Sequence, residues 1–244
     1  MRTDISVLAG ILAIALLSMP VYAFGPARGR VDPNEIEDRG SFVLGSFVRN
    51  WFYWFLHPLE KVSLWLHLGP LFHNLLGVAF GVAAGVLFAV GWVNLAGWAI
   101  LLGGVADILD GRIARALGVA DERGAFLDST LDRFAEVGAF VGLAVLFGRR
   151  VVPLVLVTTA LGGSLLVSYA RARGESVGIV CKQGVMQRAE RLLILAFGAI
   201  LDPAVAAWSG RAPGALLIVA VGLVAVGTVG TAVYRTVWIA QRLS

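Results

Sequence analysis

Long apolar runs separated by short polar breaks make up most of this chain. Six of them follow one another, at 72–91, 94–111, 125–148, 151–171, 189–208 and 213–234. A helix needs about 20 apolar residues to cross a bilayer, so each run predicts one membrane-spanning helix. The pattern therefore predicts an all-α integral membrane protein, in which residues 72–244 form a six-helix transmembrane bundle.

The residues before this bundle divide into three segments. Residues 1–23 are largely apolar, and we interpret them as an extra N-terminal anchor helix or, alternatively, as a signal-like segment that ends in small residues. Residues 24–40 are rich in glycine, proline and mixed charge, which is typical of a linker. Each of these two segments is expected to lie outside the bundle.

The third segment, at 41–71, is aromatic and apolar and is interrupted by a few charged residues and histidines. Tryptophans at 51, 54 and 65 favour the headgroup region of a bilayer. We predict an interfacial amphipathic helix that lies on the membrane and is interrupted near Pro58, with a spanning helix as the alternative.

Composition agrees with a membrane protein. The chain is 58% hydrophobic and 15% charged, whereas soluble domains average about 45–50% apolar and about 25% charged residues. The single cysteine, Cys181, can form neither an internal disulfide nor a cysteine metal site. The glycines at 77, 81 and 85 are four residues apart, a spacing that allows close helix packing.

The net charge of +4 is better explained by membrane topology than by nucleic-acid binding. Of the 20 lysines and arginines, 16 fall on one side of the predicted bundle, and the other four are Arg2, Arg149, Arg150 and Arg211. Because basic loops stay in the cytoplasm, we expect a multi-pass protein of the cell (inner) membrane. The loop at about 111–124 then faces the cytoplasm.

Four carboxylates stand in otherwise apolar sequence on both sides of that loop. Asp107 and Asp110 are three residues apart, and Asp128 and Asp132 are four apart, so each pair shares one helix face. A carboxylate inside a membrane helix costs roughly 2.5–3.5 kcal/mol and marks a functional site. Oxygen ligands without nearby cysteine or histidine suit Mg²⁺ or Mn²⁺, which share ligands with substrate phosphates. The stretch predicts metal-assisted chemistry on a phosphorylated substrate at a membrane face.

The spacing also resembles a known signature. The pattern Asp-x₂-Asp-Gly-x₂-Ala-Arg-x₈-Gly-x₃-Asp-x₃-Asp, filled by Asp107, Asp110, Gly111, Ala114, Arg115, Gly124, Asp128 and Asp132, is similar to that of the CDP-alcohol phosphatidyltransferases. The resemblance implies a CDP-diacylglycerol donor, a small polar alcohol as acceptor, and CMP as a product. It also implies a homodimer in the lipid bilayer.

The resemblance further implies residue roles. Asp107, Asp110 and Asp128 would hold one Mg²⁺ (or Mn²⁺), and Asp128 with Asp132 a second. Asp132 would be the catalytic base. The CDP donor would bind at Asp110, Gly111, Ala114, Arg115 and Gly124. Glu136, one turn beyond Asp132, either supports the site or is simply a polar helix residue.

A second cluster, between Ser168 and Arg191, is basic. It could follow from topology alone, or it could form an anion pocket. The pattern Ser-Tyr-x-Arg-Ala-Arg-x-Glu at 168–175, followed by Arg-Ala-Glu-Arg-Leu at 188–192, is similar to the prokaryotic phosphatidylinositol-phosphate synthases of the same family. That resemblance implies inositol phosphate as acceptor, with its phosphate held by Arg171, Arg191 and Arg235.

Two other functions fit parts of the pattern. The same chemistry could use glycerol 3-phosphate, serine or another alcohol as acceptor, although an uncharged acceptor would not need three arginines. An ion-coupled transporter could use the aspartates as an ion site, but such proteins often carry inverted repeats, and the sequence shows none.

Overall fold

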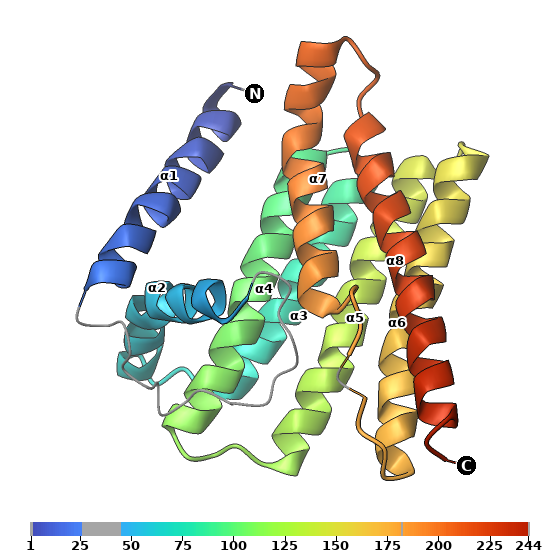
Figure 1. The fold of residues 1–244 in the computed structure, drawn as a ribbon. Coiled ribbons are helices and arrows are strands. Elements are labelled where there is room, and N and C mark those ends of the chain that lie inside the picture. Colours follow the sequence, from blue (N-terminus) through green and yellow to red (C-terminus); the bar gives the residue numbers. More distant parts are fainter. Residues whose placement is uncertain (1, 26–44, 182, 244) are drawn as a thin grey trace.

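The computed structural model describes residues 2–25, 45–181 and 183–243, and this part of the chain is all-helical. Figure 1 shows the arrangement. The helices are α1 (Arg2–Phe24), α2 (Gly45–Trp65), α3 (Pro70–Ala89), α4 (Val93–Ala116), α5 (Glu122–Phe147), α6 (Val151–Ser176), α7 (Arg188–Ser209) and α8 (Ala215–Ala240). The predicted all-α fold is confirmed.

Helices α3 to α8 form one bundle, and α1 stands apart from it (Figure 1). Helix α3 packs against α4 and α5, α7 packs against α4 and α8, and α6 packs against α5 and α8. Buried apolar side chains from all six helices make a single core, in which Phe88, Phe140, Leu143 and Leu217 are almost fully enclosed. The bundle buries its apolar faces inside while leaving many large apolar side chains outward, as expected for a surface that faces lipid.

One helix of the bundle differs from the other five. Helices α3, α4, α6, α7 and α8 are long and apolar enough to cross a membrane. Helix α5 has 26 residues, but six of them are charged and all six lie at or before Glu136. The predicted six-helix bundle is thus present, with five apolar spans and a sixth helix whose first half is polar.

Small residues bring α3 and α5 unusually close. A Cβ atom added to Gly85 would overlap the carbonyl of Gly138, and one added to Gly142 would overlap the backbone of Gly85. A Cβ added to Gly81 would likewise overlap Ala135. The predicted glycine spacing on α3 therefore does allow close packing, and its partner is the second half of α5.

Helix α2 lies crosswise to the bundle helices (Figure 1). It is amphipathic, because Trp51, Leu56 and Glu60 are buried while His57 and Lys61 are exposed. The predicted interruption near Pro58 is wrong, since the helix runs through this proline. A proline removes one backbone hydrogen bond, and packing of the flanking side chains keeps the helix continuous.

The N-terminal predictions are only partly covered. Helix α1 coincides with the predicted anchor at 1–23, and it meets α2 where the Trp51 indole N–H donates to Ser18 Oγ at 2.9 Å. Its role as an anchor stays a prediction. The predicted linker at 24–40 lies outside the described residues, apart from its first two.

Candidate active site

The two carboxylate pairs lie on neighbouring helix ends. Asp107 and Asp110 occupy the last three turns of α4, which ends at Ala116. After a short turn, Asp121 caps α5 by accepting a hydrogen bond from the Gly124 N–H at 2.7 Å. This cap starts α5 with the register that turns Asp128 back toward α4.

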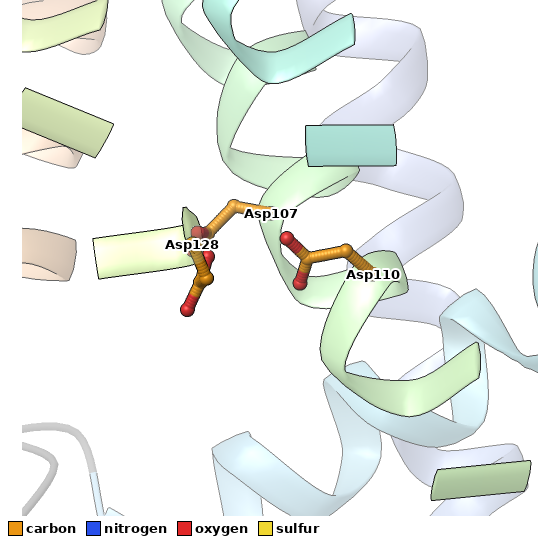
Figure 2. Close-up of side chains that lie close together, drawn as sticks. All are labelled: Asp107, Asp110 and Asp128. Carbon is orange, nitrogen blue, oxygen red and sulfur yellow. The ribbon is translucent and has the colours of Figure 1, made fainter. Parts of the chain in front are cut away.

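Three carboxylates meet in the space between α4 and α5. Figure 2 shows Asp107, Asp110 and Asp128 pointing toward one another. One oxygen of each lies within 4.8 Å of the other two. Asp110 is buried, and its Oδ1 accepts the Gly111 N–H. Its Oδ2 is also buried and has no hydrogen-bond partner among the described residues.

This donor set fits a hard divalent cation. Three carboxylate oxygens without cysteine or histidine suit Mg²⁺ or Mn²⁺ better than Zn²⁺. A buried carboxylate oxygen without a donor is costly, and a cation would satisfy it. The prediction of a metal site at Asp107, Asp110 and Asp128 therefore has a physical basis in the geometry.

Asp132 lies outside this group of three and contacts arginines instead. Its Oδ1 is 2.6 Å from Arg188 Nη2, and its Oδ2 is 3.7 Å from Arg133 Nη1. The other terminal nitrogen of Arg188 is 2.5 Å from Asp107 Oδ1. One guanidinium thus joins a carboxylate of α4 to a carboxylate of α5, a contact that the sequence did not predict.

The residues predicted to bind the CDP donor border the same space. Gly111, Ala114 and Arg115 lie in the last two turns of α4, and Gly124 lies in the first turn of α5. Ala114 and Arg115 are half-buried, and Gly124 is exposed. These residues lie at the ends of α4 and α5 that one short turn connects.

The three arginines predicted to hold the acceptor phosphate are also neighbours. Arg171 lies in the last two turns of α6, Arg191 in the first turn of α7 and Arg235 in the last two turns of α8. Arg171 and Arg191 are each close enough to Arg235 for their charges to interact with it. Their surroundings differ. Arg171 is exposed and is paired with Glu175 at 2.8 Å.

The other two arginines of this cluster are buried and already hydrogen-bonded. Arg191 contacts both oxygens of Glu136, at 2.8 and 3.3 Å, and both side chains are almost fully enclosed. Arg235 donates to the carbonyls of Gln183 and Val167, at 2.9 and 3.0 Å. Glu136 therefore supports the basic cluster and not Asp132 directly.

Comparison with known proteins decides the class. Residues 71–242 match the model of the family described as CDP-alcohol phosphatidyltransferase. The chain belongs to the CDP-alcohol phosphatidyltransferase family.

Relatives and solved structures agree with this assignment. The transferase is 35% identical over 223 residues to a phosphatidylinositol phosphate synthase from Streptomyces avermitilis, covering 86% of this chain and 87% of that protein. It is 33% identical over 170 residues to an archaetidylinositol phosphate synthase from Methanothermobacter thermautotrophicus, covering 70% and 82% of the two chains.

Crystal structures of the Mycobacterium tuberculosis phosphatidylinositol phosphate synthase resemble the present fold. The structure with CDP-DAG bound has a TM-score of 0.66 and 30% identity, over 75% of this chain and 92% of the other. The structure in complex with manganese and citrate has the same TM-score and 31% identity, over 74% and 88%. The chain is thus a metal-dependent phosphatidyltransferase of the membrane, and the transporter alternative is set aside.

Sequence reasoning missed two features of the transferase site. Arg188 belongs to the basic loop, and nothing in local spacing distinguishes it from its neighbours. A second buried pair joins Arg112 Nε to Glu60 Oε2 of α2 at 2.7 Å, with the Tyr53 ring 5.1 Å from the guanidinium. Arg112 follows Gly111 directly, so α2 is tied to the end of α4 that carries Asp107 and Asp110.

Proposed function

We propose that this enzyme transfers the phosphatidyl group of CDP-diacylglycerol to a hydroxyl of inositol phosphate and releases CMP. The observation that carries the proposal is the position of the basic cluster beside the carboxylates. Asp132 contacts Arg188. Arg191 lies one turn further along α7 and is close enough to Arg235 for their charges to interact. The names of the bacterial relatives support the same acceptor.

Each carboxylate has a proposed role. Asp107, Asp110 and Asp128 would hold one divalent cation, and Asp128 with Asp132 a second. When bound, these cations neutralise the diphosphate and the charge that develops on the leaving CMP. Asp132 takes the proton from the acceptor hydroxyl as that oxygen attacks the phosphorus attached to diacylglycerol.

The donor is proposed to lie against the adjoining ends of α4 and α5. The small side chains of Gly111, Ala114 and Gly124 leave the backbone accessible to the cytidine and diphosphate. Asp110 would bind the donor through the metal ion, and Arg115 would donate to a phosphate oxygen there.

The acceptor phosphate is proposed to bind at Arg171, Arg191 and Arg235. Arg171 is exposed, so it can exchange Glu175 for a phosphate at little cost. Arg191 and Arg235 are held at fixed positions by protein groups, Arg191 by Glu136 and Arg235 by backbone carbonyls. Three cations around one anion favour a phosphorylated acceptor over free inositol or serine.

Topology and assembly complete the proposal. The site faces the cytoplasm at the inner membrane, because the basic residues collect on that side. Residues 1–23 anchor the chain, 24–40 link it, 41–71 lie at the interface, and 72–244 carry the catalysis. We also propose a homodimer, which the family resemblance implies and which cross-linking in native membranes would test.

Acceptor choice is tested with purified enzyme in detergent, CDP-diacylglycerol and Mg²⁺ or Mn²⁺. CMP release is followed while inositol phosphate, inositol, glycerol 3-phosphate and serine are offered separately. We expect release with inositol phosphate alone and none after chelation of the metal. Release with another acceptor would keep the carboxylate chemistry and overturn the assigned acceptor.

A matched pair of variants tests the phosphate site. Arg171→Gln should raise the KM for inositol phosphate, whereas Arg173→Gln should leave it unchanged. Arg173 is exposed on the same helix end, and its guanidinium donates to Ser176 Oγ at 3.3 Å. Equal KM values in both variants would remove Arg171 from the acceptor pocket.

A further inference from the structure

One side chain, that of Arg188, bridges the two carboxylate-bearing helices α4 and α5. Its Nη1 is 2.5 Å from Asp107 Oδ1 on α4, and its Nη2 is 2.6 Å from Asp132 Oδ1 on α5. All three side chains are largely enclosed. Two charge-assisted contacts of this length are strong and directional.

This bridge uses oxygens that the proposed metal site also needs. Asp107 belongs to the group of three carboxylates that can hold a cation. Asp132 is the proposed base and a ligand of the second ion. The Arg188 guanidinium and a divalent ion would compete for the same carboxylate oxygens, because the two cations repel each other at such short distances.

The position of Arg188 has no explanation in helix formation. It is the first residue of α7, where the helix dipole is positive and a cation is unfavourable. Arg191, one turn along, is different, because it is buried against Glu136, which is not among the proposed metal ligands. The carboxylates of α4 and α5 are the partners that account for a cation at position 188.

We propose that Arg188 is a positioning residue that serves as the internal counter-ion of the metal-free site and is displaced when the divalent ion binds. Asp107 and Asp132 repel each other, which would push α4 and α5 apart. Arg188 offsets this repulsion while no metal is bound. Binding of the metal then frees the guanidinium beside the basic cluster. This inference rests on the proposed metal site.

The test measures Mn²⁺ binding directly, by the loss of the free-ion electron paramagnetic resonance signal, on full-length enzyme in detergent. In Arg188→Gln the competitor is gone, so we expect a dissociation constant for Mn²⁺ that is roughly tenfold lower than in the wild type. Thermal unfolding gives a second readout. The variant should melt below the wild type without metal and match it at saturating Mn²⁺.

Arg133→Gln is the matched control. Arg133 is also a cation beside Asp132, but at 3.7 Å, and it donates to the Ser129 carbonyl at 2.6 Å. It contacts no second carboxylate in the described structure, so its loss should change the Mn²⁺ dissociation constant much less. Arg188→Lys keeps the charge without the two-pronged contact, and it should give a smaller gain in affinity if Arg188→Gln does not fold.

The outcomes separate this inference from the function on which it rests. Failure of the wild type to bind Mn²⁺ would overturn the metal site itself. Mn²⁺ binding by the wild type with an unchanged or higher dissociation constant in both position-188 variants would overturn the counter-ion role. Equal loss of melting temperature with and without Mn²⁺ would likewise show a purely structural arginine.

Discussion

The two halves of α5 differ in composition and in what they contact. The first half, up to Glu136, carries all the charge of the helix and faces α4, α7 and open space. The second half carries Gly142, where an added Cβ would overlap the backbone of Gly85, and Gly138, whose carbonyl leaves no room for a Cβ on Gly85. One end of α5 therefore carries charged side chains of the candidate site, and the other end packs closely against α3.

The difference shows how a membrane enzyme can hold several like charges in place. Repulsion among Asp107, Asp110 and Asp128 pushes α4 and α5 apart at the site. Close packing of α3 against α5, and of α3 against α4, opposes this away from the site. We therefore expect the removal of a charge at the site to reduce activity without loss of stability, and an added methyl group in the packed half to reduce stability.

The largest expected effect is on the chemical half. Asp128→Asn removes a proposed metal ligand, and we expect the rate of CMP release to fall by about 10³-fold or more, roughly 4 kcal/mol. Melting temperature should stay the same or rise, because repulsion among the carboxylates is reduced. Near-normal turnover in this variant would remove Asp128 from the metal site.

Glu136 lies at the boundary between the halves. Glu136→Leu leaves Arg191 buried and unpaired, which should destabilise the fold by about 3 kcal/mol or more. Adding Arg191→Leu should recover much of that stability, since an apolar pair can replace a buried ion pair. Chemical or thermal unfolding in detergent measures both.

The double variant also sharpens the comparison. We expect it to fold and yet to show a raised KM for inositol phosphate, because one cation of the proposed pocket is lost. A double variant that is as unstable as Glu136→Leu alone would contradict the view that unpaired charge causes the loss.

The packing half is tested with a single methyl group. Gly142→Ala introduces a Cβ that overlaps Gly85, and we expect about 2 kcal/mol of destabilisation from overpacking. Gly162→Ala on α6 is the control, because nothing lies within 4 Å of its added Cβ. It should be neutral or slightly stabilising, since alanine favours a helix by up to about 1 kcal/mol over glycine. Equal melting temperatures would show that α3 and α5 are not in close contact.

The smallest effect is expected at the start of α5. Asp121→Ala removes the N-cap that accepts from Gly124, which should cost about 1 kcal/mol and affect turnover modestly. Glu122→Ala, next in sequence, makes no cap and serves as the control. A loss of stability in both variants, and not in Asp121→Ala alone, would point to charge at the helix end and not to the cap.

Much of this arrangement could be predicted from local pattern. The apolar runs predicted the bundle helices closely, for example 72–91 against Pro70–Ala89 and 151–171 against Val151–Ser176. The three- and four-residue spacings placed each aspartate pair on one face. Both signals depend on helix periodicity alone, which a sequence displays directly.

What could not be predicted involves partners far apart in the chain. Arg188 meets residues 81 and 56 positions away, and Glu60 meets Arg112 across 52. Helix periodicity does not predict contacts between residues so far apart. The segment from 168 to 191 is rich in arginine for topological reasons, so its sequence does not show that Arg188 bridges two helices. The sequence resemblance implied that Arg191 binds the acceptor phosphate, but it did not predict that Arg191 is also paired with Glu136.

The pair between Glu60 and Arg112 has a consequence for exchanging parts between relatives. It is buried, with each side chain about 3% exposed, and it joins α2 to the residue of α4 that follows Gly111. A chimera that takes its first 69 residues from another family member must bring an acid at position 60. Without it, Arg112 loses its buried carboxylate partner next to the proposed metal ligands.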